Sequence, residues 1–361
     1  MATVVFAPDS FKGTLRASDA ARALAEGWRA VRPYDELVPI PMADGGEGTL
    51  DAFELANAGS RRMPVTVTGP DGRPIAAHWL LLPDGTGVVE LACTSGIELL
   101  TDGPRPLTAH TLGFGQAVRA AVEHGVGRLI LGIGSSASTD GGAGMLRALG
   151  ADLRDAEGAP ISDGARGLAH LARADLAGVL TLPETLVLSD VTNPLLGPRG
   201  AAAVFGPQKG LDEKGIAVAE EGLARLARAL GADPGQPGAG AAGGTGFALL
   251  ALGATLVPGS ERLGALLGLP EALSRADAVV TGEGRFDDQS LSGKVPGYVL
   301  GLAGDGPVSL VAGIIAADAD TRQFAAALSL TELAGSAETA TREPGRWLTE
   351  AGRRLAAAMR T

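Results

Sequence analysis

Short apolar runs alternate with amphipathic stretches at both ends of the chain. Five of these runs have the length and composition of strands, and they lie at residues 3–8, 36–40, 277–281, 307–312 and 326–331. Segments with helical spacing of apolar residues, such as 18–31, separate them. This alternation predicts βαβ units and hence one five-stranded parallel sheet built from both ends of the chain.

The pattern changes from Arg61 onward. Residues 61–93 alternate with period two between Pro-Asp-Gly turns, which predicts antiparallel hairpins. Further apolar runs at 127–134 and 185–190 end in polar loops, and 212–231 has one apolar helical face. The middle of the chain therefore mixes hairpins with strand-and-helix units.

The two patterns predict an α/β protein with two domains. The parallel sheet would belong to a discontinuous domain at residues 1–60 plus 275–361, interrupted by an inserted α/β domain with antiparallel hairpins at 61–274. A length of 361 residues suits two domains that each bury a core of their own.

Charge and composition exclude several classes of partner. The 41 acidic and 30 basic residues give a net charge of −11, so no basic surface for nucleic acid is indicated. The single cysteine, Cys93, cannot form an internal disulfide. The first apolar run has no basic region before it, and the most apolar interior stretch, 247–257, is too short to span a bilayer. We expect a cytoplasmic protein without membrane or nucleic-acid partners, and the sequence leaves the oligomeric state open, a homodimer included.

Lysine is rare in this chain, and it falls mainly in polar loops. Of the 30 basic residues 30 − 4 = 26 are arginines. The lysines are Lys12, Lys209, Lys214 and Lys294. Three loops follow strands of the predicted parallel sheet, at 8–14, 42–49 and 281–294, and each combines carboxylates, hydroxyls and glycine. Because ligands bind beyond the carboxyl ends of parallel strands, the three together predict a ligand site, although a helix N-cap explains any single one equally well.

The inserted domain has four more polar loops with functional residue types. They lie at 132–146, 189–197, 205–210 and 237–246. The first is glycine-rich, follows a strand and precedes a helix, which is typical of a backbone that binds anions. The loops together supply carboxylates for a hard cation, lysine for phosphate charge and glycine for phosphate oxygens, as phosphoryl transfer requires. By contrast, Lys214 is expected to be a solvated surface charge.

Several motifs are absent or incomplete. The P-loop pattern G-x-x-x-x-G-K-[ST] does not occur, which excludes a P-loop kinase. The four histidines lie outside these loops and are not spaced like a metal pair, so a carboxylate is the expected general base. Gly132, Gly134 and Ala137 match a dinucleotide fingerprint, but no helix is predicted to open within it. A nicotinamide-dependent dehydrogenase of hydroxy acids is therefore the weaker alternative.

The polar loops, taken as an ordered set, resemble those of the bacterial type I glycerate kinases. The matching blocks are APDSFKGT, PMADGGEGT, GSSASTDGGAGMLRALG, SDVTNPLLG, FGPQKG, PGAGAAGGTG and TGEGRFDDQSLSGKVP, spread over residues 7–296. The resemblance implies ATP- and Mg²⁺-dependent phosphorylation of glycerate on a two-domain fold whose first domain is flavodoxin-like. We favour D-glycerate as acceptor and 2-phosphoglycerate over 3-phosphoglycerate as product, although the sequence itself does not decide between the hydroxyls. One departure is Thr139, where many members of that family have asparagine.

The chemistry of these loops gives each candidate residue a hypothetical role. Catalysis is assigned to Asp44 as the base, Lys12, Asp190 and Lys294. Binding of glycerate is assigned to Asp9, Ser10, Lys12, Glu47 and Arg285. Binding of ATP is assigned to Ser136, Asp140, Gly141, Gly142, Gly144, Lys209 and Glu283. Binding of Mg²⁺ is assigned to Asp190, Asn193 and Asp287. We expect the active site in the cleft between the two domains, where closure would exclude water.

One alternative from another functional class stays open on the residues alone. A non-catalytic sensor of small acids would reuse the fold and bind its ligand without forming ADP. Neither the sensor nor the dehydrogenase explains why lysines and carboxylates collect at the ends of predicted strands.

Overall fold

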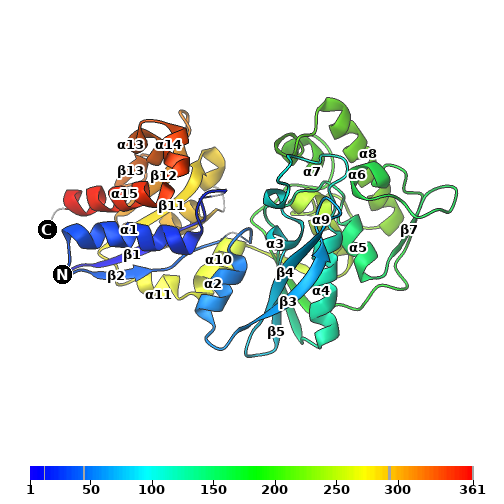
Figure 1. Ribbon diagram of the computed structural model, residues 1–361, viewed down its shortest axis with the longest axis horizontal. Coiled ribbons are helices and arrows are strands. Elements are labelled where there is room, and N and C mark those ends of the chain that lie inside the picture. Colours follow the sequence, from blue (N-terminus) through cyan, green and yellow to red (C-terminus); the bar gives the residue numbers. More distant parts are fainter. Residues whose placement is uncertain (12, 44, 292–293, 360–361) are drawn as a thin grey trace. The chain divides into compact units, whose positions relative to one another are not determined.

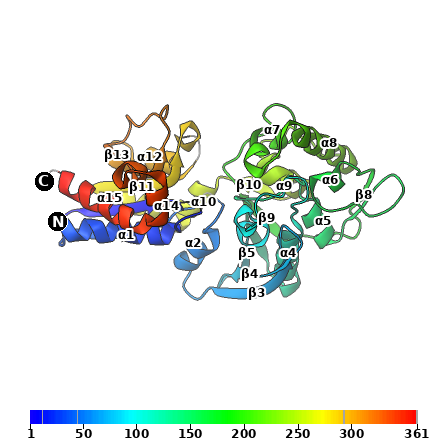
Figure 2. The ribbon, with the colours of Figure 1, turned by 45° about the horizontal axis from the view of Figure 1, so that its top comes forward.

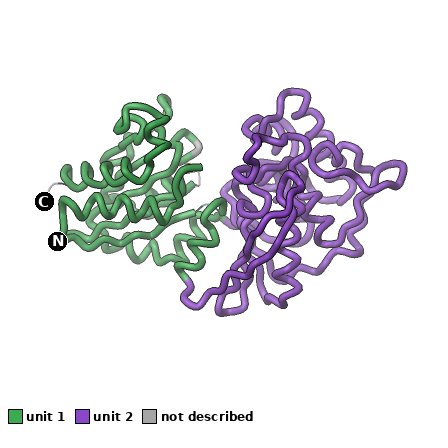
Figure 3. The backbone as a smooth tube through the Cα atoms, viewed as in Figure 1, with its two compact units in different colours: residues 1–56, 258–361 green, residues 57–257 purple. Residues whose placement is uncertain are grey.

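A computed structural model describes residues 1–11, 13–43, 45–291 and 294–359 (Figure 1). Contacts within the chain divide it into two compact units (Figure 3). Unit 1 comprises Met1–Ala56 and Pro258–Thr361, and unit 2 comprises Asn57–Val257. Both ends of the chain therefore contribute to unit 1.

The sheet of unit 1 has five parallel strands in the order β13-β12-β11-β1-β2. They are β1 (Thr3–Pro8), β2 (Glu36–Pro39), β11 (Ala278–Phe286), β12 (Val308–Ile315) and β13 (Ala326–Ser329). Numbered within this sheet alone, the order is that of flavodoxin-like folds, with the reversal of strand order between β1 and β11. The predicted five-stranded flavodoxin-like sheet is confirmed.

Helices cover both faces of this sheet. Successive residues of a strand point to opposite faces, so Phe6 of β1 packs against Trp28 on one face while Val5 packs with Val299 on the other. The helices of unit 1 are α1 (Ala17–Val31), α2 (Thr49–Ala56), α10 (Gly259–Leu266), α11 (Leu269–Leu273), α12 (Val295–Ala303), α13 (Leu330–Ala334), α14 (Ala337–Arg342) and α15 (Pro344–Ala358), with the 3₁₀ turn η3 (Asp288–Leu291). Burial of both faces explains why the strands are continuous apolar runs.

The first and the last helix of the chain pack side by side, as Figure 2 shows. A Cβ atom at Gly27 of α1 would lie 1.9 Å from the carbonyl oxygen of Thr349, and one at Gly352 of α15 would lie 2.2 Å from that of Leu24. The two glycines therefore allow the backbones of α1 and α15 to approach closely.

The sheet of unit 2 is mixed, with six strands in the order β10-β9-β6-β5-β4-β3. The antiparallel part consists of β3 (Arg61–Thr68), β4 (Pro74–Leu81) and β5 (Thr86–Glu90). The parallel part continues from β5 through β6 (Arg128–Gly132), β9 (Glu184–Leu188) and β10 (Thr255–Val257). A separate antiparallel pair is formed by β7 (Asp152–Arg154) and β8 (Arg173–Asp175). The predicted hairpins and the α/β class are confirmed.

The helices of unit 2 enclose one large core with this sheet. They are α3 (Ala92–Ser95), α4 (Leu112–His124), α5 (Ala143–Leu149), α6 (Gly164–Leu168), α7 (Ala201–Phe205), α8 (Glu213–Leu230) and α9 (Ala241–Ala251), with the 3₁₀ turns η1 (Ile97–Leu99) and η2 (Pro207–Lys209). Ala219, Leu223 and Leu226 of α8 are buried in the core, on the helix face that the apolar spacing predicts. No helix in the described part of either unit is both long and apolar enough to cross a membrane.

Unit 2 begins at Asn57 rather than at 61, and two further boundaries differ more from the sequence prediction. Unit 2 ends at Val257 rather than 274, because α10 and α11 belong to unit 1, where Leu269 and Leu273 join the core beneath β1. The strand expected at 277–281 continues to Phe286, because it pairs with β12 from Val279 as far as Phe286. Glu283 therefore lies on a strand and not in a loop.

Candidate active site

The point where the unit 1 sheet reverses its strand order carries buried polar side chains. Asp9 and Ser10 follow β1 directly, Glu283 lies in the last part of β11, and all three are buried. The backbone N–H of Asp9 donates to the carbonyl of Gly282 at 2.8 Å and holds the two strands together at this edge. Three predicted site residues therefore meet where flavodoxin-like sheets bind their ligands.

Among the residues that the structure describes, the others predicted in unit 1 are less enclosed. Lys12 and Asp44, predicted in the loops after β1 and β2, lie outside the described residues. Glu47 is half-buried in the loop before α2, and Lys294 is half-buried at the N-cap of α12. Arg285 is exposed near the end of β11.

In unit 2, Lys209 is a buried lysine at the end of the turn η2. The residue is 4% exposed. Its Nζ donates to Oγ of Ser136 at 2.7 Å and to the carbonyl oxygen of Ser138 at 2.5 Å. Gly210, which follows, has a φ of 88° and ends the turn in the left-handed region that glycine tolerates best.

Burial changes the acidity of this lysine. Desolvation penalises the ammonium form and lowers the pKa of Lys209 to about 7, while the negative charge of Asp140 acts in the opposite direction. A lysine with such a pKa can be charged or neutral near neutral pH, so its charge depends on what binds beside it.

Asp140 organises the loop between β6 and α5. Its Oδ1 accepts hydrogen bonds from Oγ of Ser138 at 3.0 Å and from the N–H of Gly142 at 3.2 Å. Its Oδ2 accepts from the N–H and the Oγ of Thr111, at 2.9 and 2.8 Å, and from the N–H of Gly144 at 3.2 Å. The carboxylate is fully buried. It therefore satisfies N–H groups at the start of α5 and ties them to the start of α4.

Packing accounts for the three glycines of this loop. A Cβ atom at Gly141 would lie 2.6 Å from Cδ2 of Leu226, and one at Gly144 would lie 2.5 Å from the backbone nitrogen of Leu112. Gly142 has a φ of 78° and donates to Asp140. The N–H groups of these glycines are thus engaged within the chain, and their predicted contact with phosphate stays a prediction.

Three loops of unit 2 pack together at the carboxyl ends of its parallel strands. The N–H of Gly240 donates to the carbonyl of Asn193 at 2.9 Å, which joins the loop 237–246 to the loop after β9. A Cβ atom at Gly243 would lie 2.1 Å from the carbonyl oxygen of Ser138, so the same loop also packs against the one after β6. The structure thus brings Asn193, Ser136 and Lys209 into one cluster of loops.

The oxygen donors of the loop after β9 suit a magnesium ion that is shared with a phosphate. Asp190 is half-buried there, and Nδ2 of Asn193 donates to the carbonyl of Arg199 at 2.8 Å, so the amide oxygen is the donor available to a cation. No group of three or more His, Cys, Asp or Glu side chains within the described ranges forms a metal site. Mg²⁺ in proteins is often bound by only one or two carboxylates together with substrate phosphates and water. The carboxylate of Asp190 and the amide oxygen of Asn193 are consistent with such a site.

The third predicted magnesium ligand, Asp287, belongs to unit 1. Its carboxylate lies 3.5 Å from Nε of Arg285, and its N–H donates to Oγ of Ser290 at 3.0 Å. A cation at Asp287 would therefore share the carboxylate with a guanidinium.

Two buried polar residues, one at the end of β5 and one at the start of α4, were not singled out from the sequence. Glu90 ends β5 in register with Gly132 of β6, and Thr111 accepts from the N–H of Met145 at 3.0 Å while it donates to Asp140. Glu90 ends the apolar run GVVE, just as Asp190 follows an apolar run. The same sequence pattern therefore could have identified Glu90 as a candidate site residue. A threonine in a polar loop carries no such signal.

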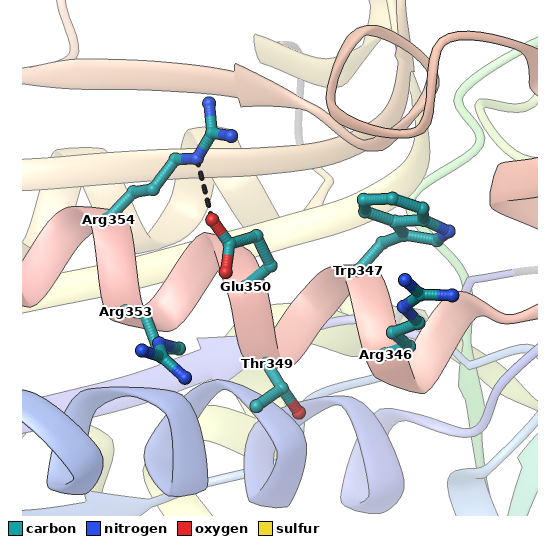
Figure 4. Close-up of a pocket in the computed structure, with 6 residues that line it drawn as sticks. All are labelled: Arg346, Trp347, Thr349, Glu350, Arg353 and Arg354. Carbon is teal, nitrogen blue, oxygen red and sulfur yellow. Dashed lines mark hydrogen bonds and ion pairs between the residues drawn. The ribbon is translucent and has the colours of Figure 1, made fainter.

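A shallow hollow of about 450 Å³ lies along α15 of unit 1. Arg346, Trp347, Thr349, Glu350, Arg353 and Arg354 line it. In Figure 4, Thr349 and Arg353 point toward α1 while Trp347, Glu350 and Arg354 point the other way. Nε of Arg354 donates to Glu350 at 3.0 Å. These side chains do not converge on a common point, so the hollow is not a candidate site.

Comparison with known proteins identifies the family. Residues 4–360 match the sequence profile of the Glycerate kinase family. The chain belongs to the glycerate kinase family. Glycerate 2-kinase from Escherichia coli (strain K12) is 44% identical over 311 residues, which cover 83% of this chain and 81% of that protein. Glycerate kinase from Bacillus subtilis (strain 168) is 42% identical over 330 residues, which cover 88% and 86%.

A solved structure agrees with this assignment. A crystal structure named for glycerate kinase 2 from Salmonella typhimurium LT2 matches with a TM-score of 0.76 at 39% identity, and the match covers 99% of this chain and 97% of that one. The motif resemblance is confirmed, and the chain is an enzyme of the kinase class. The dehydrogenase interpretation lacks support, because α5 begins only at Ala143, well after Gly132, Gly134 and Ala137.

Proposed function

We propose that this enzyme transfers the γ-phosphoryl group of ATP to D-glycerate in the presence of Mg²⁺, and that 2-phosphoglycerate rather than 3-phosphoglycerate is its product. The match to the Glycerate kinase family over residues 4–360 carries this proposal. The name of the relative from Escherichia coli, glycerate 2-kinase, supports the 2-hydroxyl as the acceptor.

Unit 1 is proposed to bind the acceptor. Glycerate needs a cation for its carboxylate and an oxygen acceptor for the proton of the attacking hydroxyl. Lys12 and Arg285 are the proposed partners of the carboxylate, and Asp44 is the proposed base. The buried side chains of Asp9 and Ser10 and the half-buried Glu47 would orient the hydroxyls.

Unit 2 is proposed to bind most of the phosphate chain of ATP. The residues assigned to the nucleotide are Ser136, Asp140, Gly141, Gly142, Gly144 and Lys209 in unit 2 and Glu283 in unit 1. Within this set Lys209 is the direct partner of phosphate, and Asp140 acts as a positioning residue because its oxygens already hold five donors. Lys294 would neutralise charge on the transferred group.

Asp190, Asn193 and Asp287 are the residues proposed to hold magnesium. The ion would supply neutralisation of the charge on the phosphate oxygens. Phosphoryl transfer leaves little covalent chemistry to a protein, so catalysis here rests on positioning and electrostatics. Because the proposed acceptor residues belong to unit 1 and most phosphate residues to unit 2, we propose that both units contribute to one active site that excludes water when closed.

The experiment that tests this function measures ADP formation by the purified protein with Mg-ATP. Parallel reactions contain D-glycerate, L-glycerate, glycerol or no acceptor, and one D-glycerate reaction contains excess chelator. We expect ADP to form only in the reaction that contains both D-glycerate and magnesium. Phosphorus NMR of that reaction should identify 2-phosphoglycerate as the product. An equal rate without acceptor, or no ADP with either enantiomer, would contradict the proposal.

A further inference from the structure

Two buried polar groups of unit 2 lack the partners that burial normally requires. Lys209 is 4% exposed and forms no ion pair with any residue that the structure describes. Thr139 is 1% exposed, and its Oγ has no hydrogen-bond partner among those residues. A buried charge without a counter-ion and a buried hydroxyl without a partner each destabilise a folded protein.

The two groups are linked through the backbone of one loop. The ammonium of Lys209 donates to the carbonyl oxygen of Ser138, and Thr139 is the next residue along the chain. The same ammonium donates to Oγ of Ser136, so two of its three N–H donors are accounted for. One N–H of the lysine therefore remains to be satisfied, and so does the O–H of Thr139, the residue after the one whose carbonyl accepts from the ammonium.

Asp140 is not the missing counter-ion. Its charge favours the ammonium form of Lys209, and it is the charged group that acts on this lysine. However, its two oxygens already accept five hydrogen bonds from Ser138, Thr111, Gly142 and Gly144. The carboxylate is committed to holding the loop, and an anion that pairs with Lys209 has to come from outside the chain.

The loop that presents these groups is held from several sides. The N–H of Ala137 donates to the carbonyl of Ser95 at 3.1 Å, and the N–H of Ile97 donates to that of Ser135 at 2.9 Å. Asp140 fixes the following residues through Thr111. A loop fixed in this way keeps its polar groups in place before any ligand binds, which reduces the ordering cost of binding.

We propose that Lys209, Ser136 and Thr139 form a buried subsite in unit 2 that binds a phosphate group. The ammonium and two hydroxyls offer three donors to the peripheral oxygens of a terminal phosphate, and lysine acts as a point charge toward it. Naming phosphate rests on the proposed kinase function. The phosphate belongs either to the nucleotide or to the phosphorylated product, and the experiment below separates these two sources.

The subsite makes phosphate binding dependent on a proton. The pKa of Lys209 is about 7 without a ligand, and a bound phosphate favours the ammonium form and raises that pKa. Above pH 7 binding therefore takes up a proton, and affinity falls as the pH rises. The negative charge of Asp140 favours the same charged form of Lys209.

The test is calorimetric titration at about pH 8 in two buffers of different ionisation enthalpy, which counts the protons taken up on binding. The probes are Mg-ADP, 2-phosphoglycerate and D-glycerate, each added alone. Wild type is compared with Lys209→Met and Thr139→Val, and Lys214→Met serves as the control because Lys214 is exposed on the first turn of α8. The T139V variant keeps the shape of the side chain and removes only the hydroxyl.

We expect wild type and K214M to take up close to one proton with a phosphate-bearing probe, and K209M to take up none. T139V should weaken that probe by roughly tenfold, as expected for a hydrogen bond to a charged group. Its thermal stability should not fall, because the hydroxyl that it loses has no partner in the free protein. If a proton is taken up with Mg-ADP but not with 2-phosphoglycerate, the phosphate that binds belongs to the nucleotide. If a proton is taken up with 2-phosphoglycerate but not with Mg-ADP, it belongs to the product.

Equal proton uptake by wild type and K209M would overturn the subsite. Proton uptake with D-glycerate but with neither phosphate-bearing probe would also overturn it, since the only anionic group of D-glycerate is a carboxylate. Unchanged phosphate affinity in T139V would remove Thr139 from it. This test is independent of turnover. Proton uptake with Mg-ADP by a protein that does not phosphorylate glycerate would support the subsite and contradict the proposed function. Phosphorylation of glycerate without proton uptake on binding would support the proposed function and contradict the subsite.

Discussion

Five donors surround the carboxylate of Asp140, and each of its oxygens accepts at least two of them. Substitution of this carboxylate is expected to destabilise the folded protein, because every donor that loses its acceptor remains buried. The hydrogen bonds join the start of α4, through Thr111, to the start of α5, through Gly144. At the residue scale, Asp140 therefore holds the loop, and its proposed contribution to phosphate binding is indirect, through that loop.

Replacing Asp140 by asparagine should lower the free energy of unfolding by about 2–4 kcal/mol, because an amide N–H₂ would face N–H donors and the negative charge would be lost. Urea denaturation followed by circular dichroism measures the change. The matched control is Asp152→Asn, since Asp152 is exposed and its pair with Arg154 is a surface ion pair worth at most about 1 kcal/mol. Equal effects of the two substitutions would contradict the structural role of Asp140.

Lys209 gives a prediction for stability against pH. Its pKa falls from 10.5 in the unfolded chain to about 7 in the folded one, so between these values the unfolded chain holds a proton that the folded chain does not. The cost of burying the ammonium is therefore full below pH 7 and lessens as the pH rises. Without ligand, the stability advantage of Lys209→Met over wild type should shrink by roughly 2–3 kcal/mol between about pH 6 and about pH 9.

Urea denaturation of both proteins at several pH values, in buffers without phosphate, checks this prediction. Lys214→Met provides the comparison, since Lys214 is exposed and its removal should leave the pH dependence unchanged. A constant difference between Lys209→Met and wild type across the range would show that Lys209 titrates at its usual pKa in the folded protein.

Single residues were predictable where the residue type itself is informative. Lys209 stood out because lysine is rare in a chain that otherwise uses arginine, and Asp190 because a carboxylate follows an apolar run. Thr111 and Ser138 could not be found in this way, because their importance comes from contacts with Asp140, which is 29 residues from Thr111 in sequence. Neighbourhoods of that kind depend on how the loops pack.

At the scale of elements, the loops after β6 and β9 and the loop 237–246 form one packed group. Gly243 and Gly244 have φ values of 64° and 91°, and they lie against Ser138 and Gly141. Side chains at either position would collide with the backbone of the loop after β6. The low-complexity appearance of the sequence PGAGAAGG, which alone suggests a linker, therefore reflects close packing of backbones.

Gly144→Ala tests how tightly the loop and the two helices fit. The added Cβ atom would lie 2.5 Å from the backbone nitrogen of Leu112, so α4 and α5 must move apart, at an expected cost of about 2–4 kcal/mol. Thermal unfolding measures this cost. The matched control is Gly301→Ala within α12, where a Cβ atom meets nothing within 4 Å and helix propensity should raise stability by up to about 1 kcal/mol. Similar melting temperatures for both variants would contradict the close approach.

Elements were more predictable than their packing. Alternation of apolar runs was sufficient to place all five strands of the unit 1 sheet, because both of its faces are buried and each strand is a continuous apolar run. The extension of β11 to Phe286 was missed, because Gly282, Glu283 and Arg285 make its last part look like a loop. Its pairing with β12, which is set by tertiary structure, overrides the local composition.

At the scale of the whole molecule, unit 1 is assembled from the two ends of the chain. α1 and α15 pack through Gly27 and Gly352, and β1 lies between β2 and β11. Unit 1 therefore cannot be completed until the segment after Pro258 has been synthesised, whereas unit 2 is continuous in sequence. The proposed catalytic roles are divided between the two units in the same way. Asp44, the proposed base, belongs to the first segment of unit 1, and Asp190, a proposed magnesium ligand, belongs to unit 2.

Substitution of one carboxylate in each segment separates their proposed roles. Asp190→Asn should raise the magnesium concentration needed for half-maximal activity, because an amide is a weaker ligand of a hard cation, and excess magnesium should restore most of the turnover. Asp44→Asn should lower kcat by roughly 10²–10⁴-fold even at saturating magnesium, which is the usual contribution of a general base. Activity measured against magnesium concentration at saturating ATP and D-glycerate distinguishes the two patterns. Asp288→Asn is the control, since Asp288 is exposed and has no assigned role. Equal and small effects of all three substitutions would remove both assignments, and a magnesium-dependent defect in Asp44→Asn would exchange them.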